Sequence, residues 1–410
     1  MTTLTRWLQA GTCGVMGTAS TMACIIAALG LMPLKGASAA AVSAARIRIA
    51  EETGAIAVRA AENKVKPQDI LTRSSFLNAI TVLQAIGGST NAVVHLMAII
   101  NRHPAVAGTI TLDTFDEIGR KTPLLVDLKP SGENYMTDFH NSGGMPALLH
   151  QLKPLLHLSA PTITGQTLGE LLEKTKYAPV PQDSPVSCIR PLSNPLYPAS
   201  SLVVLRGNLA PGGAVMKASA SKDRRLLKHR GTAVVFANSA DMAARIDDPN
   251  LKVDADSVLV LQSIGPVGNP GMPEAGMIPI PRKLAAQGVE DMLRISDGRM
   301  SGTAGGTIVL HVSPESAHPK SVLGVVRDGD MVECDVDQRV LSIDVTGAAI
   351  ARRQKQRREK LESEEPADGG DVAPWAARRK MRGYRGLYMR SVNQAEEGAD
   401  FDFLTAAGPS

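Results

Sequence analysis

The chain of 410 residues is 44% apolar and 20% charged, which is the balance of a soluble globular protein with two or three domains. Aromatic residues make up only 3%, which argues against single-stranded nucleic-acid binding because that function needs aromatic stacking platforms. The net charge of +4 is small for this length, so we expect neither nucleic acid nor a membrane as a partner.

The N-terminal region allows two interpretations. An apolar stretch at 23–34 precedes a run of small residues at 36–44, and together they have the outline of a secretory signal. However, Lys35 interrupts the approach to that run, and the apolar stretch is too short to span a bilayer. The four cysteines do not form a disulfide framework, which favours a reducing compartment. We therefore expect a cytoplasmic protein.

Helical patterns dominate the first half of the chain. Ser20 or Thr21 can cap a helix that Gly30 ends, and Gly87-Gly88 separates two further helices. The predicted helical segments are 21–30, 39–62, two within 74–103, 145–156 and 168–175.

The amino-acid composition changes at 177–200, which indicates a domain boundary. This stretch holds six prolines and no helical period, which is typical of a linker. We therefore expect one domain over 1–176 and a second over 201–410.

The second half of the chain is rich in β-branched residues. "RDGD" at 327–330 predicts a hairpin turn between two strands. Short helices are expected at 239–246 and 282–288, and the charge-dense segment 352–365 predicts a solvated surface helix. The predicted strand regions are 201–207, 231–238, 257–265, 306–314 and 321–345.

The first candidate for chemistry is Cys13. An isolated cysteine is most often buried and inert, and neither the spacing to Cys24 nor the neighbouring residues suit zinc. However, "GTCGVMGT" places the thiol in a glycine-supported turn just ahead of a helix, where backbone amides and the helix dipole favour a thiolate. Both interpretations stay open on these residues alone.

Two glycine-rich loops downstream carry the other candidates. "GNPGMPE" presents Glu274 at its end, where the carboxylate could face Mg²⁺ or stand on an ordinary surface loop. "DGRMSGTAGGT" at 297–307 places Ser301 where substrate and backbone donors can approach closely. It is neither a nucleophile elbow, because G-x-S-x-G is absent, nor a phosphate loop.

Seven motifs, taken together and in order, resemble the dihydroxy-acid and sugar-acid dehydratases, a family that includes phosphogluconate dehydratase. The resemblance runs from about Gly11 to Leu404, and two of its segments are closer to the sugar-acid branch. The motifs are "GTCGVMGTASTM" (11–22), "GGSTNAVVHL" (87–96), "SGGMPALL" (142–149), "RGNLAPGGAVMK" (206–217), "GPVGNPGMPE" (265–274), "DGRMSGTAGGT" (297–307) and "NQAEEGADFDFL" (393–404).

The resemblance implies specific roles. Cys13 would be one of three thiolates that hold a [2Fe-2S] cluster, and Glu274 would bind Mg²⁺. Ser301 would remove the C2 proton as an alkoxide, and Thr303 would lie beside the substrate. The reaction implied is the elimination of water from a 2,3-dihydroxy carboxylic acid to give a 2-keto acid. A homodimer or homotetramer in the cytoplasm is implied as well.

The resemblance also implies a fold, and it implies that the N-terminal part of the family's sequence is missing here. The fold would be an α/β N-terminal portion, the incomplete remainder of the cluster-bearing domain, and a β-rich, barrel-like C-terminal domain. The active site would lie between them. Residues 1–10 contain no Cys, Asp, Glu or Lys, whereas the family carries two cluster cysteines and further Mg²⁺ ligands ahead of this point. We expect the C-terminal two thirds of a hydro-lyase, truncated at its N-terminus. The alternatives are a non-catalytic remnant or interaction subunit, and one half of a split enzyme.

Other polar residues near these motifs have two interpretations. His95 is expected on a core or helix face, whereas His140 and His311 could line the site or make ordinary hydrogen bonds. Lys217, at the end of "GAVMK", could approach a substrate carboxylate or cap a strand end. Asp400 and Asp402 are expected to dock the C-terminal segment.

Overall fold

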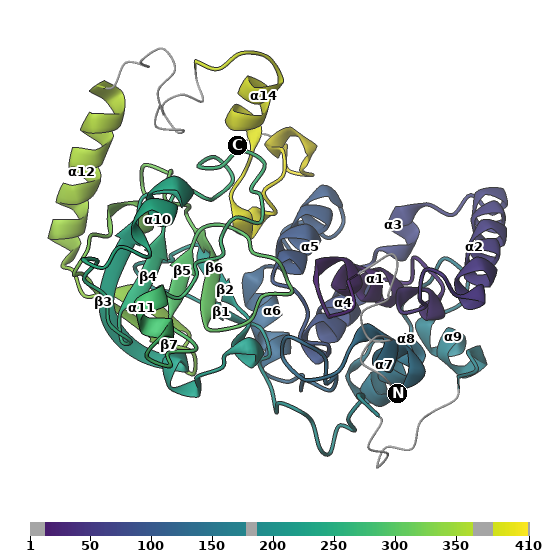
Figure 1. Ribbon diagram of the computed structural model, residues 1–410. Helices are drawn as coiled ribbons and strands as arrows, with labels where there is room; N and C mark the ends of the chain where they lie inside the picture. The colour runs from purple at the N-terminus through teal and green to yellow at the C-terminus, as the bar shows by residue number, and fades with distance from the viewer. Residues whose placement is uncertain (1–12, 178–186, 364–379, 409–410) are drawn as a thin grey trace. The chain divides into compact units, whose positions relative to one another are not determined.

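The computed structural model describes residues 13–177, 187–363 and 380–408. The chain divides into two compact units (Figure 1). The first unit contains residues up to Ala92 together with Ala105–Leu202, and the second contains Val93–Pro104 together with the residues from Val203 onward. No helix among the described residues is long and apolar enough to cross a membrane.

The first unit is helical. Its described residues contain isolated β-bridges but no strand, so only the helical part of the expected α/β character is seen. The helices are α1 (Thr18–Ala28), α2 (Ala44–Glu62), α3 (Pro67–Ile70), α4 (Arg73–Ala85), the start of α5 (Asn91–Arg102), α6 (Leu112–Gly119), α7 (Met136–Asn141), α8 (Gly144–Leu152) and α9 (Leu168–Lys174).

Helix α4 forms the core of this unit. Every residue from Asn78 to Ala85 is buried, so the helix is enclosed by other elements, including α1 (Figure 1). Its one large polar side chain in this stretch, Gln84, is satisfied: Oε1 accepts from Leu202 N at 3.0 Å and Nε2 donates to Leu202 O at 3.1 Å. A buried amide with these partners fixes the end of the Pro-rich segment against the helical core.

The second unit is built on an eight-stranded sheet in the order β1-β2-β6-β5-β4-β3-β7-β8. Strands β3, β4, β5 and β6 pair in parallel, and the other pairs are antiparallel. The strands are β1 (Val203–Leu205), β2 (Gly213–Met216), β3 (Lys228–Phe236), β4 (Val258–Leu261), β5 (Arg294–Ser296), β6 (Ile308–Ser313), β7 (Met331–Asp335) and β8 (Val340–Ile343).

The two ends of this sheet meet. Just after β1, Arg206 N donates to Arg339 O at 2.8 Å, and Leu341 N in β8 donates to Arg206 O at 2.7 Å. The sheet is therefore a nearly closed barrel, which confirms the barrel-like expectation for this half. Alternate residues such as Met216, Val260 and Val309 fill its interior.

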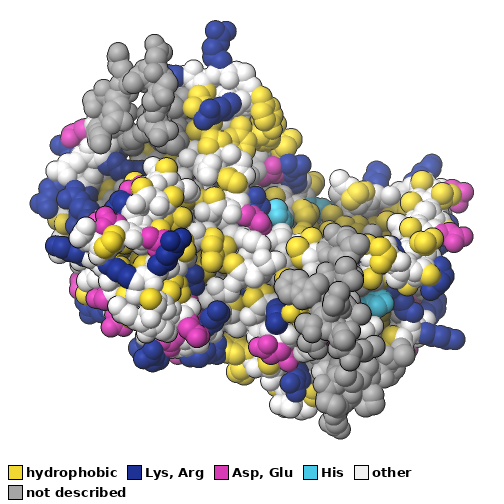
Figure 2. Space-filling model, viewed as in Figure 1, with side chains coloured by type: hydrophobic (Ala, Val, Ile, Leu, Met, Phe, Trp, Pro, Cys, Tyr) yellow, Lys and Arg dark blue, Asp and Glu magenta, His cyan; other side chains and the backbone are white. Residues whose placement is uncertain are grey.

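Helices cover the outer face of the barrel. Leu284 of α11 (Arg282–Ala285) and Met242 of α10 (Ser239–Arg245) pack on the outward residues of β3 and β4 (Figure 1). The charge-dense helix α12 (Gly347–Ser363) is mostly exposed, and Figure 2 shows Lys and Arg side chains gathered where it lies. Helix α14 (Gly383–Ser391) and two 3₁₀ turns, Ala395–Glu397 and Asp402–Leu404, form the described C-terminal segment.

One turn prediction was wrong. The "RDGD" segment does not join two strands, because the residues before it form a 3₁₀ turn at Leu323–Val325. Asp330 instead binds Arg353 of α12, with oxygen–nitrogen distances of 2.6 and 2.9 Å. The real hairpin lies one strand later, between β7 and β8.

Candidate functional site

Two loops leave the same edge of the barrel. Strands β4 and β5 are neighbours and run in parallel, so their carboxyl ends lie side by side. The loop that carries Glu274 follows β4, and the loop that carries Ser301 follows β5. In open and closed parallel sheets this edge is where ligands commonly bind, because the loops there are free to carry polar groups.

Direct hydrogen bonds join these two loops. Arg299 Nε donates to Met272 O at 2.6 Å, and Gly276 N donates to Arg299 O at 2.7 Å. A side chain at Gly276 would bring its Cβ within 2.7 Å of the same carbonyl oxygen, so the approach requires glycine. Glu274 is therefore held between two points of attachment to the loop of Ser301.

Buried carboxylates hold the bases of both loops. Asp297 Oδ1 accepts from Ile264 N at 3.1 Å, and its Oδ2 accepts from Ser316 N at 2.7 Å. Glu315 accepts from Val267 N and Gly268 N at 2.8–3.0 Å. Burial raises the pKa of both acids, that of Glu315 to about 7.

The serine and the threonine of the second loop form a hydroxyl pair. Ser301 Oγ lies 2.8 Å from Thr303 Oγ1, with Ser301 half-buried and Thr303 exposed. The neighbouring Met300 packs with Ile308 and Leu310 on the outer face of β6. This apolar attachment fixes the loop while it leaves both hydroxyls accessible.

One histidine interacts with groups on both loops. His95, on the part of α5 that belongs to the second unit, is half-buried. Burial and the charge of Arg299 lower its pKa, while the exposed Glu274 raises it, so Arg299 and Glu274 each lie within electrostatic range of His95. His95 is thus on a helix face, as expected, and that face is turned toward the candidate residues.

His311 has an unusual environment. It lies in a bulge of β6 with φ at 56°, a left-handed value that is rare for a side-chain-bearing residue. It is buried, and neither ring nitrogen has a hydrogen-bond partner among the described residues. Burial, assisted by Arg299 and His95, lowers its pKa to about 3. The ring is therefore neutral at physiological pH and can donate from one nitrogen and accept at the other.

Cys13 belongs to the first unit. It is exposed in the turn before α1, and that turn is attached by hydrogen bonds from Met16 N to Lys129 O at 3.0 Å and from Met136 N to Gly14 O at 2.8 Å. The other three cysteines are buried, and burial raises the pKa of each thiol to about 12; they are Cys24, Cys188 and Cys334. Cys13 is accordingly the cysteine best placed to bind a metal.

The fit to a cluster or to magnesium can be judged from the ligands present. A [2Fe-2S] cluster needs three or four protein ligands, and Mg²⁺ is bound through carboxylates, waters and substrate. Among the described residues there is no group of three or more His, Cys, Asp or Glu side chains that could hold a metal ion. The ligands proposed from the sequence are one exposed thiol, Cys13, and one exposed carboxylate, Glu274, which do not make a complete ligand set.

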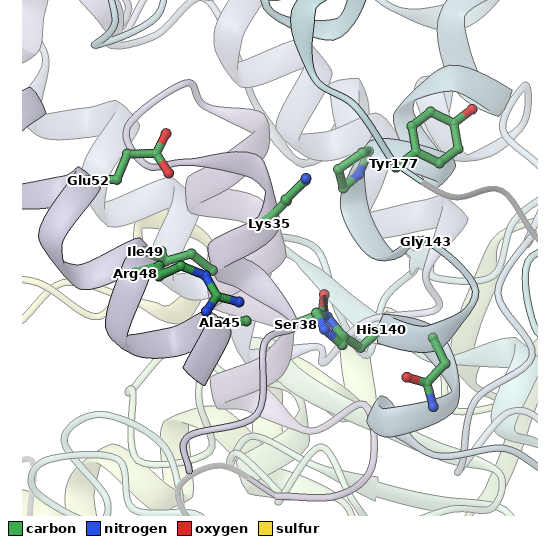
Figure 3. A pocket seen from close by; sticks show the side chains of 11 residues that line it. Lys35, Ser38, Ala45, Arg48, Ile49, Glu52, His140, Gly143 and Tyr177 are labelled. Atoms are coloured by element: carbon green, nitrogen blue, oxygen red, sulfur yellow. Dashed lines mark hydrogen bonds between the residues drawn. The ribbon is translucent and has the colours of Figure 1, made fainter. Parts of the chain in front are cut away.

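The first unit also holds a cavity of about 500 Å³ (Figure 3). Lys35 and Arg48 line it together with Glu52, and Ser38 Oγ lies 3.1 Å from Nδ1 of His140. Burial and the nearby cations lower the pKa of His140. His140 thus both lines a cavity and makes an ordinary hydrogen bond within the first unit.

Comparison with known proteins decides the family. A model described as dihydroxy-acid/6-phosphogluconate dehydratase N-terminal matches residues 5–171, and the corresponding C-terminal model matches residues 187–399. The chain belongs to this dehydratase family. Because both of the family's domain models match, the expectation of a resemblance to the C-terminal two thirds only is wrong, and this coverage gives no support to N-terminal truncation.

Three relatives illustrate the range of the dehydratase family. A putative dehydratase IlvD1 of Rhizobium meliloti is 42% identical over 98% of this chain and 65% of its own length. An L-arabonate dehydratase of Azospirillum brasilense is 45% identical over 93% of this chain and 62% of its own. A dihydroxy-acid dehydratase of Sulfurisphaera tokodaii is 41% identical over 84% and 59%. The chain thus spans less than two thirds of the length of these relatives.

Of the residues proposed from the sequence, Glu274, Ser301 and Thr303 lie on the two joined loops of the second unit. Arg299 was not singled out, although it joins these loops. Its place two residues before Ser301, in a loop otherwise made of small residues, was the available signal.

Proposed function

We propose that the chain acts as a hydro-lyase on a 2,3-dihydroxy carboxylic acid and gives a 2-keto acid. The observation that carries this proposal is the match, in order, of both domain models of the dehydratase family. The hydroxyl pair of Ser301 and Thr303, beside the loop of Glu274, supplies groups suited to the proton transfer that such a reaction needs.

The proposed reaction breaks two bonds on adjacent carbons. The C2 proton goes to Ser301 Oγ, the electron pair of the C–H bond forms the C2–C3 double bond, and the 3-hydroxyl leaves as hydroxide. The departing proton and hydroxide make one water, and the enol becomes the 2-keto acid by moving a proton to C3. A serine hydroxyl is a weak base, so its alkoxide must be stabilised. Thr303 Oγ1, at 2.8 Å, is placed to donate to it.

We further propose Cys13 as a ligand of a [2Fe-2S] cluster and Glu274 as a ligand of Mg²⁺, the groups that the family resemblance implies. Bound there, they would supply Lewis-acid assistance to the leaving hydroxyl and to the developing enolate. The described residues offer one candidate ligand for each group, so we derive no step of the reaction through them.

For the substrate we propose a sugar acid. Three relatives have printed sugar-acid names: an L-arabonate dehydratase, a 6-deoxy-6-sulfo-D-gluconate dehydratase and an L-arabinonate dehydratase are 45%, 42% and 41% identical to this chain. Dihydroxy-acid dehydratases are 37–41% identical, so a 2,3-dihydroxy-3-methyl acid is the second candidate. We also propose a cytoplasmic homodimer or homotetramer, which light scattering of the purified protein would test.

The experiment is a substrate panel. The purified protein, reconstituted with iron, sulfide and Mg²⁺, is incubated with aldonates and with 2,3-dihydroxy-3-methyl acids, and 2-keto acid is measured by hydrazone formation. We expect keto-acid formation from at least one aldonate. Binding of these acids without formation of any keto acid would contradict the proposal and favour the non-catalytic alternative.

A further inference from the structure

A buried amine without a partner lies at the end of β2. Lys217 follows Met216 directly, and its side chain is only 8% exposed. Nζ has no hydrogen-bond partner among the described residues. Burying a cation without an anion is strongly unfavourable. A residue in this condition calls for an explanation.

The same unit shows how a buried cation is normally accommodated. Arg294 is 3% exposed, and its guanidinium donates to Asp291 Oδ1 at 2.8 Å. It also donates to the carbonyl oxygens of Ile278 and Met292 at 3.1 and 3.2 Å. The fold therefore supplies an anion and carbonyl oxygens to one buried cation and none of these to Lys217.

The strand register gives the direction of Lys217. Met216 pairs with Val309 of β6, and both side chains belong to the interior of the barrel. Lys217 lies one residue beyond the end of β2, and the alternation of side chains, continued by one residue, assigns it to the outer face. There, the register continued by one residue sets Lys217 opposite Ile308, which packs with Met300 beneath the loop of Ser301.

Hydrogen bonds join the segment after Lys217 to that loop. Gly306 N donates to Ala220 O at 2.8 Å, and the hydroxyls of Ser221 and Thr307 lie 2.7 Å apart. The backbone that carries Lys217 and the loop that carries Ser301 are thus one connected structure.

We propose that Lys217 binds the carboxylate of the hydroxy-acid substrate. This inference rests on the function proposed above, because every substrate of that class carries a carboxylate next to the carbon that loses its proton. An ammonium group directed under the loop of Ser301 would hold that end of the substrate and so place C2 near the serine hydroxyl. The carboxylate of the substrate then supplies the anion that Lys217 lacks among the described residues.

The lowered pKa of the Lys217 amine agrees with this assignment. Burial lowers the pKa of Lys217 to about 7. A carboxylate bound beside it would favour the charged form, so the ion pair forms only when the acid binds. A neutral ligand of the same shape gains nothing from this interaction.

The test compares an acid with its neutral amide. Titration calorimetry measures the binding of L-arabonate, D-gluconate and their aldonamides to the unmodified protein, to Lys217→Met and to Lys217→Arg. Lys228→Met is the matched control, because Lys228 is 79% exposed and pairs with Asp335 at 3.1 Å. Circular dichroism and thermal unfolding check that each variant is folded.

We expect Lys217→Met to weaken acid binding by about 10- to 100-fold and to leave amide binding unchanged. Lys217→Arg should retain part of the acid affinity, and Lys228→Met should retain all of it. Equal losses for acid and amide, an unchanged acid affinity, or no acid binding by the unmodified protein would each overturn the assignment.

Keto-acid formation, measured in parallel, separates this inference from the proposed function. Dehydration by a Lys217→Met variant with unchanged acid affinity would remove only the role of Lys217. Loss of acid affinity in this variant, in a protein that dehydrates none of the panel, would support carboxylate binding and contradict the hydro-lyase activity.

Discussion

The guanidinium of Arg299 donates to the carbonyl of Met272, and the backbone carbonyl of Arg299 accepts from Gly276. These two bonds enclose Glu274 on both sides and join its loop to the loop of Ser301. One residue thus determines the relative position of the two candidate groups in the second unit.

We expect Arg299→Met to reduce keto-acid formation at least tenfold, because a misplaced catalytic group is costly even when it is present. Stability should fall by about 1 to 3 kcal/mol, as for a lost hydrogen bond to a charged group. Amide hydrogen exchange of residues 272–276 provides the structural measurement and should become faster. Unchanged exchange together with lost activity would assign Arg299 to substrate contact instead.

The hydroxyl pair is tested by three variants. Ser301→Ala should reduce the rate by about 10²–10⁴-fold, the usual contribution of a positioned base. Thr303→Val should reduce it less, because it removes only the hydrogen bond at 2.8 Å, and Thr303→Ser should restore most of the rate. The measurement is the rate of keto-acid formation at saturating substrate. A Ser301→Ala variant as active as its parent would eliminate serine as the base.

The burial of Lys217 predicts how the free energy of unfolding depends on pH. Its pKa is about 7 in the folded protein and 10.5 for an exposed lysine, so between these values the unfolded chain binds the additional proton. The free energy of unfolding should therefore rise with pH from 7 to 10.5, by about 1.4 kcal/mol per pH unit from this group. The pH-dependent part of the difference between Lys217→Met and the parent, measured by urea unfolding, should be largest at pH 7 and below and should vanish near pH 10.5. A difference independent of pH would contradict the burial of an uncompensated amine.

The cysteines should separate into one fast thiol and three slow ones. Cys13 is exposed, whereas burial raises the pKa of Cys24, Cys188 and Cys334 to about 12. An aromatic disulfide reagent at pH 8 should release one equivalent rapidly from the folded protein and four after denaturation. Cys13→Ser should abolish the rapid phase, and a second rapid equivalent would show that one of the other cysteines is accessible.

The loops of the candidate site were predictable from the sequence because glycine and proline identify them directly. "GNPGMPE" and "DGRMSGTAGGT" have compositions that are typical of loops. The strand before the first loop, β4, was predicted because it is apolar and contains two valines, whereas β2 and β5 contain one β-branched residue each and were not predicted as strands. Both loops could therefore be recognised, but the pairing of β4 with β5 that brings them together could not.

Tertiary contacts account for the other differences. "RDGD" has the composition of a hairpin turn, but Asp330 is bound by Arg353 from a helix far along the chain, which no local pattern reveals. The bulge at His311 is equally invisible, because "GTIVLHVSP" alternates like a regular strand. Lys217 has no hydrogen-bond partner among the described residues. This could not be predicted either, because it depends on packing and not on local sequence.

The seam between β1 and β8 has a consequence for assembly. Both backbone groups of Arg206 are already used by Arg339 and Leu341. A foreign strand could not pair with Arg206 without displacing these bonds, so the sheet cannot be extended at this residue by simple edge pairing. Any association of copies across this part of the barrel therefore has to use side chains. Point substitutions of those side chains would change the association without breaking the backbone hydrogen bonds of the barrel.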